Sequence, residues 1–154
     1  ENICKQVGAN YQDILNKRIF NLMSFEEVVT AARSGVDFQL HTHRHLFDLE
    51  NSDKMRDEII ENKEILMKLC GKEPIHFCYP SGFHSKKARP VLERLGIVSA
   101  TTTEQGIAFR SILRWAMPRL LDGQNVHQLE FEAELSGFCE ILRYIGKSLL
   151  SRSN

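Results

Sequence analysis

The stretch "IHFCYPSGFHSKKARPVLERLGIVSATTT", residues 75–103, predicts a strand, a helix and a second strand in direct succession. Residues 75–79 form a short apolar run, and "PSGFHS" after it consists of typical turn residues. Apolar residues at helical spacing predict a helix over residues 85–95, with Ser85 as its N-cap. The β-branched run at 97–103 predicts the next strand.

The same alternation continues on both sides of this stretch. The order is helix, strand, helix, strand, helix, strand, helix, which predicts an α/β fold with parallel strands and outer helices. We expect a single domain over residues 1–154, with residues 1–21 extended or peripheral. The remaining predicted elements are a helix over 24–35 with a Ser24–Glu27 capping box, a strand over 36–40, a helix over 52–70, an extended segment over 112–121 and one long helix over 125–150.

Composition excludes several classes of function. The 154 residues carry 20 Lys plus Arg and 20 Asp plus Glu, so no net field favours nucleic acid. No apolar run approaches the ~20 residues that span a bilayer. The four cysteines lack a CxxC spacing and favour free buried thiols, hence a reducing compartment such as the cytoplasm. Secretion or a periplasmic location stays open, because the chain begins with Glu1.

Three histidines, His41, His43 and His45, crowd the end of the predicted strand at residues 36–40. If the chain stayed extended, His41 and His45 would lie about 13 Å apart at ~3.3 Å per residue. A turn would bring the pair within about 6 Å. One metal ion can then bind both imidazoles at ~2.0–2.1 Å, although a catalytic zinc uses about three protein ligands. A surface cluster without a ligand is the alternative.

A second polar loop follows the next strand, at Pro80 to Gly82. Strand ends of a parallel sheet share one edge, so this loop is expected beside the histidines. A tight turn there can direct backbone N–H groups at an anion, as an oxyanion hole does. A plain strand-ending turn explains the same residues.

Together, these motifs resemble those of the polysaccharide deacetylases, the carbohydrate esterase family that includes the nodulation-factor deacetylases. His41, Thr42 and His45 match a His-[Ser/Thr]-x-x-His metal motif. The stretch at 77–82 is similar to a segment written F-x-YP-x-G, and residues 117–120 resemble a downstream Pro-Arg segment.

The resemblance implies a partial or distorted (β/α) barrel and removal of N-acetyl groups from N-acetylhexosamine units of a poly- or oligosaccharide. It implies a divalent metal, commonly zinc, held by His41, His45 and one aspartate, which makes hydroxide available at neutral pH. The residues it assigns to substrate binding and to the oxyanion are Tyr79, Pro80, Ser81 and Gly82.

The chain also departs from the family pattern. A Thr-Phe-Asp-Asp motif, which supplies the general base and the third metal ligand, is absent and is expected upstream of Glu1. We therefore expect the chain to be the C-terminal part of a deacetylase barrel, with little or no activity alone. Its open sheet edges favour homo-oligomers. Arg119 is our candidate for the catalytic arginine that pairs with the missing aspartate.

Three other functions stay open on sequence grounds. The chain can be a catalytically silent barrel remnant that binds glycans or a protein partner. It can hydrolyse O-acetyl esters instead of amides. It can also be a structural α/β domain with a histidine-rich loop, in which case no stoichiometric metal is expected.

Overall fold

The computed structural model describes residues 1–18, 20–109 and 114–150, with side chains described up to residue 146. The chain forms two compact units, residues 1–37 and 38–154, and each is described by itself. The single-domain organisation stays a prediction.

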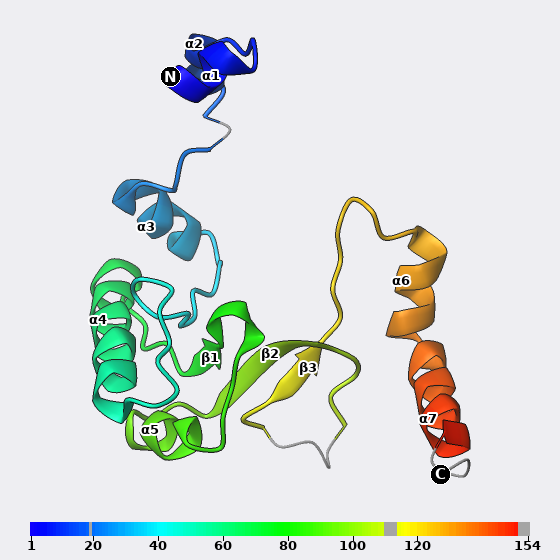
Figure 1. Cartoon of the computed structure of the whole chain (residues 1–154). Helices are drawn as coiled ribbons and strands as arrows, with labels where there is room; N and C mark the ends of the chain where they lie inside the picture. Colours follow the sequence, from blue (N-terminus) through cyan, green and yellow to red (C-terminus); the bar gives the residue numbers. More distant parts are fainter. Residues whose placement is uncertain (19, 110–113, 151–154) are drawn as a thin grey trace. The chain divides into compact units, whose positions relative to one another are not determined.

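The N-terminal unit contains three short helices, α1 (Asn2–Gln6), α2 (Tyr11–Asn16) and α3 (Phe25–Arg33) (Figure 1). The first 21 residues are thus partly helical rather than extended. The predicted capping box begins α3, since the Ser24 hydroxyl accepts from the Glu27 N–H and the Glu27 carboxylate accepts from the Ser24 N–H. A hydrogen bond from Arg18 is the main cause that lowers the pKa of Glu27 to about 2.

The second unit is built on a parallel sheet. In the described part of the chain its strands are β1 (His76–Cys78), β2 (Ser99–Gln105) and β3 (Met117–Arg119), in the order β1-β2-β3. Leu40 extends the sheet by a parallel bridge to Phe77, so only the last residue of the predicted strand at 36–40 joins the ladder. Of the extended segment predicted at 112–121, residues 112 and 113 lie outside the described residues.

Helices α4 (Ser52–Cys70) and α5 (Ala88–Arg94) lie beside each other in this unit (Figure 1). The predicted bounds of α4 are confirmed: Asn51 caps its first turn and Gly71, at φ +66°, ends it. The prediction that Ser85 caps α5 is wrong. The Ser85 hydroxyl accepts from the Lys87 N–H in a separate turn, and the helix begins after Lys87.

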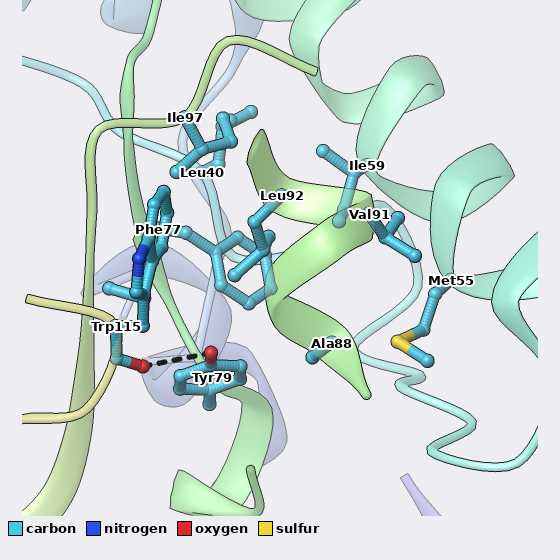
Figure 2. Packing of buried hydrophobic residues seen from close by; sticks show 11 residues of the cluster. Leu40, Met55, Ile59, Phe77, Tyr79, Ala88, Val91, Leu92, Ile97 and Trp115 are labelled. Atoms are coloured by element: carbon cyan, nitrogen blue, oxygen red, sulfur yellow. Dashed lines mark hydrogen bonds between the residues drawn. The ribbon is translucent and has the colours of Figure 1, made fainter. Parts of the chain in front are cut away.

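The core lies between the sheet, α4 and α5 (Figure 2). Phe77 and Tyr79 alternate with half-buried Cys78 along the chain, so the two aromatic rings share one face of the strand. Their rings meet edge to face with centroids 5.2 Å apart. The cluster consists of Leu40, Met55, Ile59, Phe77, Tyr79, Ala88, Val91, Leu92, Ile97, Ala100 and Trp115.

The C-terminal region contains two helices, α6 (Gln128–Leu135) and α7 (Phe138–Leu150), so the prediction of one long helix is wrong. Gly137 adopts φ +81°, a left-handed conformation that ends α6 at low steric cost. A bidentate ion pair between Arg143 and Glu134 joins the two helices. Within the described residues, no helix combines the length and apolarity needed to cross a membrane.

Candidate active site

The predicted site residues gather at the carboxyl edge of the parallel sheet. His41 follows Leu40, the Tyr79–Gly82 turn follows β1, and Arg119 ends β3. Because parallel strands end at the same edge, the fold gives all three segments a common location. This is the edge at which α/β folds place their ligands.

The two proposed metal ligands do come together. The rings of His41 and His45 lie with centroids 4.8 Å apart at an interplanar angle of 65°. The chain turns because Thr42 (φ +65°) and His45 (φ +58°) both adopt the left-handed conformation, which is uncommon for residues other than glycine. Both imidazoles are exposed, so the pair is accessible to a ligand.

A hydrogen bond to the next strand fixes the state of the His41 ring. The Nδ1 atom of His41 lies 2.7 Å from the main-chain carbonyl oxygen of Cys78. A carbonyl oxygen can only accept, so Nδ1 is the donor, and in the neutral ring Nε2 then keeps its lone pair. Metal-binding histidines use this same arrangement, in which one ring nitrogen donates to an outer acceptor and the other binds the metal.

The other polar residues of this loop face helix α4 instead. The Arg44 guanidinium pairs with Glu58 and Glu61, and His43 Nε2 lies 3.3 Å from a Glu61 oxygen. Arg44 is thus held by two carboxylates of α4. Glu58 and Asn62 belong to no motif and were not predicted from the sequence. Their signal is that they interrupt the apolar helix face formed by Met55, Ile59 and Leu66.

Thr42 lies between the two histidines and is buried, with 6% of its surface exposed. Its hydroxyl is the one fully buried side-chain oxygen or nitrogen in the described part of the chain that has no hydrogen-bond partner. A buried hydroxyl without a partner costs folding free energy, so the loop carries an unpaired polar group between its two histidines.

The turn after β1 has an unusual backbone. Ser81 (φ +54°) and Gly82 (φ +74°) are both left-handed, and a Cβ on Gly82 would lie 2.0 Å from Thr103 Oγ1. Glycine is therefore needed here for both conformation and space. The Tyr79 side chain belongs to the core, because it is 1% exposed and its hydroxyl donates to the Trp115 carbonyl over 2.9 Å. Burial raises the Tyr79 pKa to about 12.

Most N–H groups of the turn are already used. Tyr79 donates to the Thr101 carbonyl, Gly82 to the Tyr79 carbonyl and Phe83 to the Pro80 carbonyl. Pro80 has no N–H. The Ser81 N–H is therefore the amide of this turn for which the described residues provide no acceptor, and Ser81 itself is exposed.

Arg119 is anchored at the end of β3 by its Nε, which donates to the Thr102 carbonyl over 2.6 Å. Its two terminal amino groups have no carboxylate partner among the residues that the structure describes. A bidentate carboxylate can use such a fork.

Within the described ranges, no group of three or more His, Cys, Asp and Glu side chains is arranged to hold a metal ion. The histidine pair therefore supplies two ligands of the right chemical type and lacks a third in this part of the chain. Two hollows lie nearby. One of about 490 Å³ is lined by Arg44, Leu46, Phe47, Asp48, Lys54, Asp57 and Glu58, and one of about 420 Å³ by Tyr79, His84, Ser85, Lys86, Arg89, Trp115 and Ala116.

Comparison with known proteins identifies relatives of this arrangement. A profile of the family described as "Polysaccharide deacetylase" matches residues 8–100. No curated protein sequence matches. Solved structures do: the deacetylase PplD of Streptococcus pyogenes, in complex with acetate, aligns at a TM-score of 0.67 and 24% identity over 73% of this chain and 50% of its own.

Two further structures agree. A polysaccharide deacetylase from Bacillus cereus aligns at a TM-score of 0.63 and 22% identity, covering 75% of this chain and 37% of its own. IcaB from Ammonifex degensii aligns at 0.59 and 18%, covering 68% and 49%. The chain thus spans about half the length of these structures or less. At these identities the alignments confirm the fold, a part of the deacetylase barrel, as the sequence predicted.

Proposed function

Because the chain belongs to the polysaccharide deacetylase family, we propose that it takes part in removing N-acetyl groups from N-acetylhexosamine units of a poly- or oligosaccharide. One observation carries this proposal. The ring centroids of His41 and His45 lie 4.8 Å apart, and His41 is hydrogen-bonded to Cys78, the residue that precedes the Tyr79–Gly82 turn. A hydrogen bond thereby connects one candidate metal ligand to the strand that leads into the candidate acyl-binding turn.

We propose that His41 and His45 hold a divalent cation. Zinc is the first choice, because imidazole nitrogens are among its usual ligands. The donor chemistry fits, since the Cys78 carbonyl holds the proton of His41 on Nδ1 and leaves Nε2 free to coordinate. When bound, such a cation supplies a Lewis acid that makes hydroxide available near neutral pH.

The turn after β1 would act on the acetyl group. An amide that undergoes hydrolysis develops negative charge on its carbonyl oxygen, and an N–H group already in place stabilises that charge. Ser81 is our candidate donor, because the other N–H groups of the turn bind main-chain carbonyls. Pro80 and Gly82 shape the turn, and Tyr79 anchors it in the core through Trp115.

Arg119 is proposed as the residue that orients a carboxylate of the active site. Its Nε is fixed to Thr102, which leaves the terminal amino groups for a bidentate contact. A carboxylate placed this way would keep its charge at neutral pH, as a general base requires.

We expect little acetate release by the 154-residue chain alone. The described residues bring two candidate metal ligands together, whereas catalytic zinc sites use about three from the protein. The same observation favours a second candidate, a catalytically silent domain that binds N-acetylated glycans. Both candidates require recognition of the acetylated sugar. Self-association through the sheet edges stays a prediction.

The test is an NMR titration of the ¹⁵N-labelled chain, with and without zinc, with an oligomer of N-acetylglucosamine. We expect saturable shifts at the Ser81 and Gly82 amides, and weaker shifts with the fully deacetylated oligomer of the same length. Saturable shifts without acetate release would favour the silent glycan-binding domain. If neither oligomer shifts these amides, both candidates are wrong.

A further inference from the structure

The loop that carries the histidines is attached to one face of helix α4. We refer to residues 41–45 as the histidine loop. The His41 N–H donates to the Asn62 Oδ1 over 3.1 Å, and the Arg44 N–H donates to a Glu58 carboxylate oxygen over 2.8 Å. The His43 N–H donates to the main-chain carbonyl of Glu58 over 3.2 Å. Three amides of a five-residue loop are thus bound by a single helix.

These contacts act on a backbone that needs support. Thr42 and His45 lie in the left-handed region, and a residue other than glycine persists there only where its surroundings impose it. The three bound amides flank or separate these two residues, so the contacts to α4 define the path of the turn. The path in turn determines how closely the two imidazoles approach.

Glu58 is an unusual residue for its position on α4. It is 9% exposed and lies on the same face as the fully buried Met55 and Ile59. Burial alone raises its pKa, but hydrogen bonds from the Arg44 N–H and guanidinium outweigh burial and lower the pKa. A buried carboxylate is retained at low cost only where it is paired in this way. Here the pairing residue belongs to the histidine loop.

We propose that Asn62 and Glu58 are positioning residues, which hold the histidine loop in the shape that brings His41 and His45 together. Its relevance to catalysis rests on the proposed metal site, but the positioning itself is a property of the chain alone. In this arrangement α4 fixes the loop backbone from one side, and the Cys78 carbonyl fixes the His41 ring from the other.

The test uses the whole chain, labelled with ¹⁵N and free of metal. In the unsubstituted chain, the ring nitrogens of His41 are expected to show mainly the Nδ1–H tautomer. Asn62→Ala should shift this ring toward the Nε2–H tautomer and speed exchange of the His41 amide by roughly fivefold, the effect of one lost hydrogen bond. Asn62→Asp keeps an oxygen acceptor and should restore both readouts. Glu64→Ala, at an exposed position of the same helix, is the matched control and should change neither.

The outcome is decided by comparing the tautomer and amide exchange of His41 with the protection of an amide in the sheet. The Cys78 amide, which donates to Leu40, reports whether the ladder is intact. If this amide stays protected while Asn62→Ala leaves the His41 tautomer and exchange unchanged, the proposal is overturned. If Asn62→Ala prevents folding, Glu58→Ala, which removes the acceptor of the Arg44 N–H, decides: faster exchange of the Arg44 amide supports the proposal, and unchanged exchange overturns it.

A zinc titration of the same variants separates this inference from the proposed function. If the unsubstituted chain binds no zinc, the metal site is wrong, whereas the tautomer result still decides the positioning role. If the chain binds zinc, Asn62→Ala should bind it about tenfold more weakly, as is typical for residues that orient metal ligands. Equal zinc affinity in both proteins would contradict the positioning role.

Discussion

The imidazole rings of His41 and His45 lie with centroids 4.8 Å apart, although an extended chain would separate the two residues by about 13 Å. The difference comes from the left-handed residues Thr42 and His45, which turn the chain immediately after it leaves the sheet. The proposed metal site, with both histidines in one short loop, thus depends on a costly backbone path. The free energies that hold the loop and its surroundings can be tested by substituting residues that are not proposed as metal ligands.

Thr42→Val is expected to leave the free energy of unfolding unchanged or to raise it by up to about 1 kcal/mol. The two side chains have similar shapes, and the hydroxyl that is removed is buried without a partner in the described residues. Urea denaturation measures this. A loss of more than about 1 kcal/mol would show that the hydroxyl has a partner and makes a favourable hydrogen bond.

Gly82→Ala should destabilise the chain far more than Gly71→Ala. Both glycines have positive φ, +74° and +66°, so both substitutions carry a backbone cost of about 1–2 kcal/mol. Only at Gly82 would the new Cβ overlap Thr103, at 2.0 Å from its hydroxyl oxygen and 2.8 Å from its main-chain nitrogen. Comparison of the two unfolding free energies isolates the overlap. Equal losses would mean that the turn does not lie against Thr103.

Tyr79→Phe should lower stability by about 1–3 kcal/mol, because it leaves the buried Trp115 carbonyl without its donor. Binding of an N-acetylated oligomer to the folded variant should not change, since the phenol lies in the core. Thermal unfolding and the NMR titration measure the two effects. Weaker binding without any loss of stability would place the phenol in the site instead.

The contact between α6 and α7 should depend on pH. The hydrogen bond from Arg143 is the main cause that lowers the pKa of Glu134 below its ordinary value of 4.5. A lowered folded-state pKa adds stability that is fully present above about pH 4.5 and is lost as the pH falls through the folded-state value. Glu134→Gln should therefore remove this part of the acid dependence of unfolding, whereas Glu130→Gln, at an exposed position of α6, should not. Identical acid dependence in Glu134→Gln and the unsubstituted chain would contradict this role.

The sequence predicted the elements whose ends are marked by local chemistry. The Ser24–Glu27 capping box and the limits of α4 at Asn51 and Gly71 depend only on residues close together in the sequence. The structure contains both. The prediction of a single helix over 125–150 is wrong. The helical spacing of apolar residues continues past Gly137, but the backbone of Gly137 is left-handed and interrupts the helix. The cap at Ser85 is wrong for a similar reason, since its hydroxyl forms a short turn before α5 rather than the cap itself.

The candidate site was predictable in part. His41 and His45 were assigned from spacing and resemblance, and the structure places their rings together. The roles of Glu58 and Asn62 were not apparent, because they act on loop amides that lie 14 to 21 residues away in the sequence. A long-range contact of this kind leaves only an indirect signal, a polar residue within an apolar helix face. The third metal ligand stays a prediction, as does the partner of Arg119.

The central claim is that His41 and His45 form a metal site. The measurement that tests it most directly is a zinc titration, monitored by calorimetry, of the unsubstituted chain and of the His41→Ala/His45→Ala double variant. Elemental analysis of both proteins then gives the zinc content per chain. The account predicts saturable binding of one zinc per chain that disappears in the double variant. His43→Ala, which removes a histidine that faces Glu61 rather than the pair, should leave zinc binding in place. No saturable binding by the unsubstituted chain, or equal binding by the double variant, would contradict the assignment of His41 and His45 as a metal site.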